Sequence, residues 1–372
     1  MVLDDDTLNT FTAGFGNDHI TGGNLTHFFS TNVVTGDAAD LTGSSKGGND
    51  TLIGGDNLSG GNFVEANFLF GDAENSISGS AKGGNDFLIG GDALGPVGTD
   101  NLLIGDAGSS LEGLSKGGND TLIGGNNSGS DAVFNTLAGD AFVTLKDSSK
   151  GGDDILIGGN NTGEGLVLNA LVGDGLDADH GLQDSSKGGN DKLIGGNNTG
   201  EGDVQNEMSG DAQGATGSAQ CGNDTLIGGN SSGGGSVKNF FWGDANQIDG
   251  TVHAGNDVLV AGTQNLGSTV QNEMWGDAEL VVSATVTFGR DTFVFQDNVA
   301  AGQTVGTQNT IGDFQQGLDV IKFISVAGAS SFAQLSPHIT TDGVNTYIET
   351  TDDKVTLLGF HGTMTSADFL FG

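Results

Sequence analysis

The stretch KGGNDTLIGG occurs twice without change, at residues 46–55 and 116–125, and close copies follow at 82–91, 150–159 and 187–196. In each copy an aspartate follows a glycine-rich turn and precedes a short apolar run. Aligned on this aspartate, the motif recurs every 32 to 37 residues along the chain. These aspartates form what we call the first aspartate column: Asp18, Asp50, Asp86, Asp120, Asp154, Asp191, Asp224, Asp257 and Asp291.

A second motif alternates with the first and reads V-x-N-x-L-x-G-D in its clearest copies, VFNTLAGD (133–140) and VLNALVGD (167–174). Its valine, asparagine and leucine lie two positions apart, so they share one face of a β-strand. The motif defines an asparagine column: Asn32, Asn67, Asn101, Asn135, Asn169, Asn206, Asn239 and Asn272. It also defines a second aspartate column: Asp37, Asp72, Asp106, Asp140, Asp174, Asp211, Asp244 and Asp277.

A unit with only two short strands can bury its apolar side chains only by stacking on other units. An apolar residue stands two positions after each aspartate of the first column, as Leu52 does after Asp50. Stacked coils would bury these residues in a column with a spacing of about 4.8 Å. The sequence therefore predicts an all-β fold, a parallel β-roll or β-solenoid of eight to nine coils over 14–290, after a lead-in over 1–13. A third short strand is expected around the apolar residues that follow the second motif: Leu41, Ile77, Leu111, Leu145 and Ile248.

The composition limits the partners of the chain. Among 372 residues, 48 are acidic and 11 are basic, so the formal net charge is -37. This charge repels nucleic acid and anionic membrane surfaces, and it attracts cations. No apolar stretch approaches the ~20 residues of a membrane-spanning helix. The periodic apolar residues argue against a disordered acidic chain.

The two aspartate columns indicate a bound cation. Neighbouring carboxylates stacked in register repel each other by roughly 3–4 kcal/mol at an effective dielectric constant of about 20. Calcium fits the donor set, because it accepts carboxylate and backbone carbonyl oxygens in flexible geometry. No His/Cys cluster indicates zinc or iron. We therefore expect several calcium ions, held by both aspartate columns and by the glycine-rich turns at Gly47, Gly83, Gly117, Gly151 and Gly188.

Two alternatives concern the polar columns. Aspartate and asparagine are common turn residues without any metal, although nine copies in register favour a cation. The asparagine column is predicted to form a hydrogen-bonded amide ladder along the rod, and the alternative is that asparagine replaces aspartate as a metal ligand. The single cysteine, Cys221, stands where other copies have the first glycine of the turn, and we interpret it as inert.

The repeated GGNDTLIGG resembles the nonapeptide G-G-x-G-x-D-x-U-x of RTX proteins, which carry haemolysin-type calcium-binding repeats. The resemblance implies a β-roll with calcium in the glycine loops between turns. Under it, 47–50 matches the last four loop positions and Leu52 the inward apolar position. The coils of about 34 residues are longer than two nonapeptides, which leaves the ion number and the precise ligands open.

The segment 291–372 has fewer glycines and alternates like strands, as in DTFVFQDN (291–298) and TYIETTDDKVTLLGF (346–360). It resembles the C-terminal region of type I-secreted RTX proteins, whose export signal is C-terminal and uncleaved. The first residues, MVLDDDTLNT, lack the basic and apolar regions of a conventional signal peptide. The resemblance implies a β-rich cap, export by a type I secretion machinery as a transient partner, and a bacterial extracellular location.

The resulting hypothesis is a secreted calcium-binding repeat protein that folds when it meets extracellular calcium and has a structural, adhesive or binding role. The alternatives are a polysaccharide-binding or cell-surface recognition solenoid, or an accessory module of a secreted enzyme. We expect no catalytic activity, because the histidines of the chain show no HExxH spacing.

Overall fold

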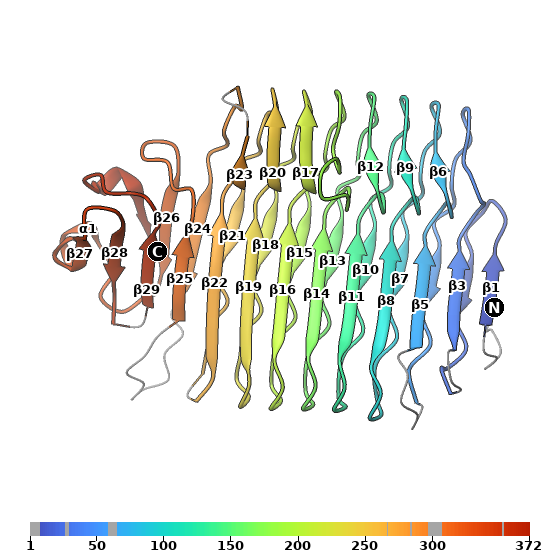
Figure 1. Ribbon diagram of the computed structural model, residues 1–372, viewed down its shortest axis with the longest axis horizontal. Coiled ribbons are helices and arrows are strands. Elements are labelled where there is room, and N and C mark those ends of the chain that lie inside the picture. Colours follow the sequence, from blue (N-terminus) through green and yellow to red (C-terminus); the bar gives the residue numbers. More distant parts are fainter. Residues whose placement is uncertain are drawn as a thin grey trace.

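The computed structural model is a parallel β-solenoid of about eight turns, as the repeats predict (Figure 1). Strands of successive turns lie side by side along the rod, and the N-terminal and C-terminal strands lie at its two ends (Figure 1). Residues 1–7 of the expected lead-in lie outside the described residues. The structure describes residues 8–26, 30–58, 65–265, 267–282, 285–296, 307–351 and 353–372.

The longest sheet, here called the long sheet, has 13 strands. It is formed by the second motif, whose alternating Val, Asn and Leu point inward. Its neighbours in order are β1 (Leu8–Thr12), β3 (Thr31–Thr35), β5 (Glu65–Phe70), β8 (Thr99–Ile104), β11 (Val133–Ala138), β14 (Val167–Val172), β16 (Val204–Ser209), β19 (Ser236–Trp242), β22 (Thr269–Trp275), β25 (Thr307–Ile311), β29 (Asp353–Leu357), β28 (Thr346–Glu349) and β27 (Ile339–Thr341).

The opposite side of the rod is an 11-stranded sheet, here called the short-strand sheet, formed by the TLI-like run of the first motif. Most of its strands have three residues, of which the central one is buried. Its order is β2 (His19–Thr21), β4 (Thr51–Ile53), β7 (Phe87–Ile89), β10 (Thr121–Ile123), β13 (Ile155–Ile157), β15 (Lys192–Ile194), β18 (Thr225–Ile227), β21 (Val258–Val260), β24 (Thr292–Gln296), β26 (Val320–Ile324) and β30 (Phe369–Phe371).

The expected third strand of each coil is also present at the positions that were predicted. Leu41 pairs with Ile77 through an isolated bridge, and Leu182 links the two three-stranded sheets in the same way. These sheets lie at the top of Figure 1. They contain β6 (Ser76–Ile77), β9 (Ser110–Leu111) and β12 (Thr144–Leu145), and then β17 (Ala212–Gly217), β20 (Ala245–Gly250) and β23 (Ala278–Val281).

Successive turns pair residue for residue, so equivalent side chains stack in columns. Leu122 pairs with Leu88 on one side and with Leu156 on the other. Asn135 pairs with Asn169 in the same manner. The columns deduced from the repeats are therefore physical columns of the molecule.

Three apolar cores run along the rod, and the turns that contain Val133 to Val270 contribute to all three. The central core contains the columns of Leu122 and Leu137, which face each other from the short-strand sheet and the long sheet. The upper core contains the column of Leu145 beneath the third strands, and the lower core contains the column of Val133. Burial of each such side chain contributes about 1.5–3 kcal/mol. Polar residues lie between the cores, because Asn135 separates Val133 from Leu137 along one strand.

The C-terminal residues continue both large sheets. β24 pairs with β21, and β25 pairs with β22, so the change of composition near residue 291 leaves the sheet pairing intact. The end of the chain adds an antiparallel turn of β27, β28 and β29, together with α1 (Phe332–Leu335), η1 (Ser336–His338) and η2 (Ser366–Asp368). No helix in the described part of the chain has the length and apolarity needed to cross a membrane.

Candidate metal centre: the carboxylate layer

The two aspartate columns lie together in one polar layer between the central and upper cores, and we call it the carboxylate layer. The second-motif strand brings Asp140 to the layer immediately before Ala141 of the upper core. The turn of the first motif brings Asp154 to the layer immediately before β13. Both side chains are buried. The layer therefore holds two carboxylates per turn away from solvent.

The first aspartate column forms a ladder in which each carboxylate uses one oxygen. The backbone N–H of Asp120 donates to Oδ1 of Asp154 in the next turn, at 2.6 Å. The same bond joins Asp86 to Asp120, and it recurs through the column. The second oxygen has no hydrogen-bond partner at Asp50, Asp86, Asp120, Asp154, Asp191, Asp224, Asp257 and Asp291.

The second aspartate column reaches across the layer to the glycine-rich turn. The N–H of Gly118 donates to both oxygens of Asp106, at 3.0 Å each. Asp140 and Asp174 are held in the same forked manner. Three members of this column instead leave one oxygen without a partner: Asp72, Asp211 and Asp244.

The glycines make this close approach possible. A Cβ atom on Gly118 would lie 1.4 Å from the carbonyl oxygen of Gly84 in the previous turn. A Cβ atom on Gly117 would lie 1.7 Å from Oδ1 of Asp140 and 2.5 Å from Oδ2 of Asp106. Two consecutive carboxylates of the second aspartate column therefore converge on the space beside Gly117, the first glycine of the turn. A backbone carbonyl of the previous turn lies against Gly118, the second glycine.

Burial raises the pKa of the carboxyl groups in the layer. The pKa of Asp86 is raised to about 11 by burial and then by the charge of Asp120. Burial raises the pKa of Asp50 to about 7. The pKa of Asp106 lies well above its usual range for the same reason, with the charge of Asp120 as the next cause. Each ionised carboxylate in the layer is therefore destabilised unless a cation or a proton neutralises it.

No basic side chain of the described residues neutralises the layer. The lysines that precede the glycines pair with one another through the backbone, as Lys116 does with Lys150, and their side chains are exposed. Of the two ion pairs found in the described part of the chain, one joins Lys146 to Glu112 and the other joins His180 to Asp177. Neither involves the carboxylate layer.

The asparagine column behaves differently, and it confirms the predicted amide ladder. Nδ2 of Asn135 donates to Gly125 O and to Oδ1 of Asn169, at 3.0 and 2.8 Å. Oδ1 of Asn135 accepts from Gly125 N and from Nδ2 of Asn101, both at 2.9 Å. Every polar atom of the amide is thus satisfied by the protein. The amides of the asparagine column therefore pair all their hydrogen-bonding atoms. Each first-column carboxylate from Asp50 to Asp291 in the carboxylate layer instead leaves one acceptor oxygen without a partner.

The predicted site residues are nearly all brought together. Sixteen of the seventeen aspartates are buried in the layer, and Asp18, at the end of the rod, is half-buried. The five glycines Gly47, Gly83, Gly117, Gly151 and Gly188 all face second-column carboxylates.

Two aspartates of the C-terminal segment extend the layer and are missing from the sequence prediction. The N–H of Asp291 donates to Oδ1 of Asp319 at 3.1 Å, which continues the first column. Asp313 accepts from the N–H groups of Gly276 and Asp277, which continues the second. The sequence signal was the run NTIGD at 309–313, a copy of the second motif beyond the glycine-rich region.

The donor chemistry of the layer fits a hard cation. Apart from the Cys221 sulfur, the acceptor atoms that converge there are carboxylate and carbonyl oxygens, which are calcium ligands. Among the described residues, three His, Cys, Asp or Glu ligand atoms lie within 4.8 Å of one another only at Asp211, Cys221 and Asp244. In the other turns a cation would therefore need carbonyl oxygens in addition to carboxylates.

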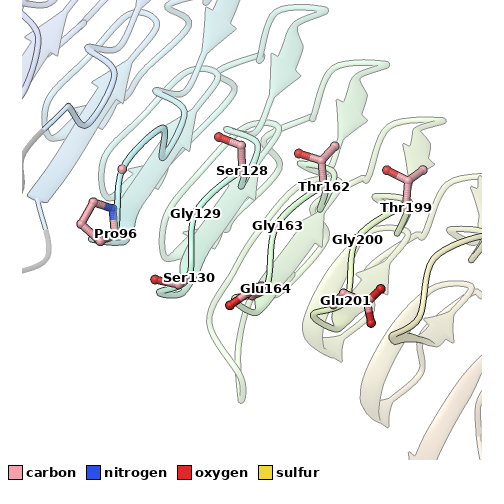
Figure 2. Close-up of a pocket in the computed structure, with 11 residues that line it drawn as sticks. Pro96, Ser128, Gly129, Ser130, Thr162, Gly163, Glu164, Thr199, Gly200 and Glu201 are labelled. Carbon is pink, nitrogen blue, oxygen red and sulfur yellow. The ribbon is translucent and has the colours of Figure 1, made fainter.

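A separate surface groove runs along the loops at the opposite edge of the rod. It has a volume of about 630 Å³. Figure 2 shows that Ser128, Thr162 and Thr199 of successive coils form one row, while Glu164 and Glu201 lie along another. The groove offers hydroxyl and carboxylate groups at the spacing of one coil.

Two comparisons with known proteins give no match. No protein-family model matches the chain, and no curated protein matches it significantly. The resemblance to RTX proteins depends on the repeated motif and on a solenoid fold that is compatible with a β-roll.

Proposed function

We propose that the protein is a calcium-dependent β-solenoid of the RTX type, secreted by bacteria, which acts as a non-catalytic structural or binding element outside the cell. One observation carries the proposal. Eight buried carboxylates of the first aspartate column each have an oxygen without a hydrogen-bond partner. Buried carboxylate oxygens without partners are costly, and calcium is the abundant extracellular cation that takes such ligands.

The residues that would hold the ions are the two aspartate columns and the carbonyl groups of the glycine-rich turns. The unused Oδ2 of Asp154 faces the same point as the carbonyl oxygen of Gly173, since a Cβ atom on Gly139 would lie 2.1 and 2.0 Å from them. A bound calcium ion supplies the positive charge that this pair of acceptors lacks. The protein supplies a dry layer and a fixed register of oxygen donors.

The same arrangement couples folding to calcium. In a compartment with little calcium, the ionised columns repel one another and disfavour the stacked state. A ligand that binds only the folded state stabilises it by mass action, and the effect grows with ligand concentration. Export of an unfolded chain followed by folding in calcium is the behaviour that this layer favours.

Calorimetric titration of the full chain with calcium tests the proposal. We expect several ions per chain and a binding enthalpy that includes folding. Magnesium serves as the matched control, because it demands regular octahedral geometry and dehydrates reluctantly. Calcium binding no tighter than magnesium binding would contradict the proposal.

Export is tested separately with the same chain. When it is expressed together with a type I exporter, we expect the protein in the medium. Retention in the cytosol, with the exporter active on another substrate, would contradict the secretion part and would leave calcium binding to its own test.

The groove of Figure 2 supports recognition of a polysaccharide as a second candidate function. Rows of hydroxyl and carboxylate groups repeated in successive coils suit a ligand that itself repeats. Binding on a glycan array, lost when Thr162 and Thr199 are both changed to valine, would support this role. If the double substitution leaves glycan binding unchanged, the groove is not the polysaccharide-binding site.

A further inference from the structure

One turn of the carboxylate layer differs from the others in chemistry. The first glycine of the turn is replaced by Cys221, the only cysteine of the chain. In the preceding turn, a Cβ atom on Gly188 would lie 1.7 Å from Oδ1 of Asp211 and 2.6 Å from Oδ2 of Asp174. The position of the first glycine is therefore the point where two consecutive carboxylates of the second column converge. Cys221 places a sulfur atom at that point.

The structure brings this sulfur between the two carboxylates that the register predicts. Ligand atoms of Asp211, Cys221 and Asp244 all lie within 4.8 Å of one another. Both aspartates are fully buried, and Cys221 is half-buried. The cluster is the only one of its kind among the described ranges of the chain.

The orientation of the two carboxylates is a second, independent observation. In the three turns immediately before it, Asp106, Asp140 and Asp174 each engage a glycine N–H with both oxygens, whereas in an earlier turn Asp72 uses one oxygen. Asp211 and Asp244 engage theirs with one oxygen, at 2.7 and 2.6 Å. The remaining oxygen of each is buried and has no hydrogen-bond partner. Two open acceptors thus flank the thiol.

We propose that Asp211, Cys221 and Asp244 bind one thiophilic divalent cation of the zinc class in place of calcium at this one turn, whereas the other turns offer oxygen ligands alone. A thiolate and two carboxylates are accepted zinc ligands, at about 2.3 Å for sulfur and about 2.0–2.2 Å for oxygen. Water or a backbone carbonyl would complete a four-coordinate shell. The site goes beyond the proposed calcium function and does not depend on it, because its defining ligand is the sulfur.

Binding exchanges a proton for the metal. The Cys221 sulfur lies within 4.8 Å of a ligand atom of each of the two carboxylates, so one cation can bind all three groups. The cation forms a bond to sulfur, the S–H bond breaks, and the proton leaves to buffer. No electron is transferred. The cation neutralises the thiolate and the two carboxylates together.

Cobalt(II) is the probe, because a thiolate bound to cobalt gives a charge-transfer band in the near ultraviolet and an oxygen ligand does not. The full chain is titrated in saturating calcium, which occupies the oxygen-only positions. We expect the band to saturate at one cobalt per chain and to be bleached by zinc. We also expect zinc to protect Cys221 from alkylation. If cobalt does not bind, or if it binds without producing the band, Cys221 is not a ligand and the proposed site is wrong. Cobalt bound without the band would be an adventitious ion only.

The matched control is Cys221→Gly, which restores the residue found in five other turns. We expect it to lose the cobalt band and to keep the calcium response and circular dichroism of the parent. The variant Asp244→Asn keeps the sulfur and should weaken cobalt binding roughly tenfold or more. A band that persists in Cys221→Gly, or a cobalt affinity unchanged in Asp244→Asn, would contradict the assignment. Failure of calcium binding with the band intact would contradict only the proposed function.

Discussion

The backbone N–H of Asp120 donates to Oδ1 of Asp154 at 2.6 Å, while Oδ2 of the same carboxylate accepts no hydrogen bond. Oδ1 of Asp154 therefore links two successive turns by a hydrogen bond, and Oδ2 is left as a buried acceptor without a partner. The asparagine column stacks the same turns with amides whose atoms are all paired. The amides are thus structural, and the contrast with them is the basis for the cation-dependent role that we propose for the carboxylates.

Replacement of Asp154 by asparagine should uncouple one turn from calcium. The new amide would accept from Asp120 with its oxygen and place an N–H₂ group toward the carbonyl of Gly173. In chelator we expect the free energy of unfolding to rise by about 1–3 kcal/mol, because an unpaired buried acceptor is removed. In calcium we expect a smaller stabilisation by the ion than in the parent. The folded fraction of parent and variant, followed by circular dichroism along a calcium titration that starts in chelator, gives both values.

The reverse change, Asn135→Asp, is the matched control for that experiment. It places an ionised group in the amide layer, where Nδ2 of Asn135 now donates to Asn169 and Gly125. We expect it to destabilise the protein in calcium and in chelator alike. If Asp154→Asn also destabilised the protein equally in both buffers, the claim that calcium stabilises the fold through the carboxylate layer would be contradicted.

The stability of the calcium-free protein should fall as pH rises. Burial raises the pKa of Asp50 and of Asp211 from 3.8 to about 7, and that of Asp277 to about 6. A carboxyl whose folded pKa is raised stabilises the fold below its unfolded pKa, and this contribution is lost as pH rises through the folded value. In chelator we therefore expect a cooperative thermal transition at about pH 5 that is weakened or lost at about pH 8.

In calcium we expect the opposite trend, with the stability of the protein increasing as pH rises, because protons compete with the ion for the same carboxylate oxygens. The affinity for calcium should decrease from about pH 8 to about pH 5. Differential scanning calorimetry across this range measures both trends. A calcium-free protein that becomes more stable as pH rises through 6 to 7 would show that these carboxyls are not the controlling groups.

The two glycines of the turn should differ in their tolerance of a side chain. A Cβ atom on Gly118 meets the backbone carbonyl of Gly84, whereas one on Gly117 meets the carboxylate of Asp140, which can rotate. We expect Gly118→Ala to cost at least about 1–3 kcal/mol by overpacking. Gly117→Ala should cost less, since Ala254 occupies the equivalent position of a later turn. Urea denaturation in calcium measures the loss in free energy of unfolding for each variant. Equal losses would contradict the described contacts of the two glycines.

Much of the fold follows from the repeats, for a physical reason. In a solenoid each turn pairs with the next in the same register, so a residue that recurs in sequence recurs in space. This is why Leu122, Asn135 and the third strand at Leu145 lie where the motifs place them. Periodicity alone does not state which side-chain atoms meet across the rod.

The parts that sequence could not supply depend on distances across the layer. The unpaired oxygen of Asp154 and the forked contacts of Asp106 result from how far two loops of one turn approach. Cys221, interpreted as inert from sequence, lies between two open carboxylates. Asp313 was missed because glycine content, rather than the second motif, marked the end of the repeats.

The most direct test of the central claim is far-ultraviolet circular dichroism of the full chain at about pH 8, recorded in chelator and then in millimolar calcium. We expect little β-structure in chelator and a cooperative gain on calcium addition, because the buried aspartate columns are then neutralised. The same β-structure in both conditions would contradict the claim that calcium drives folding.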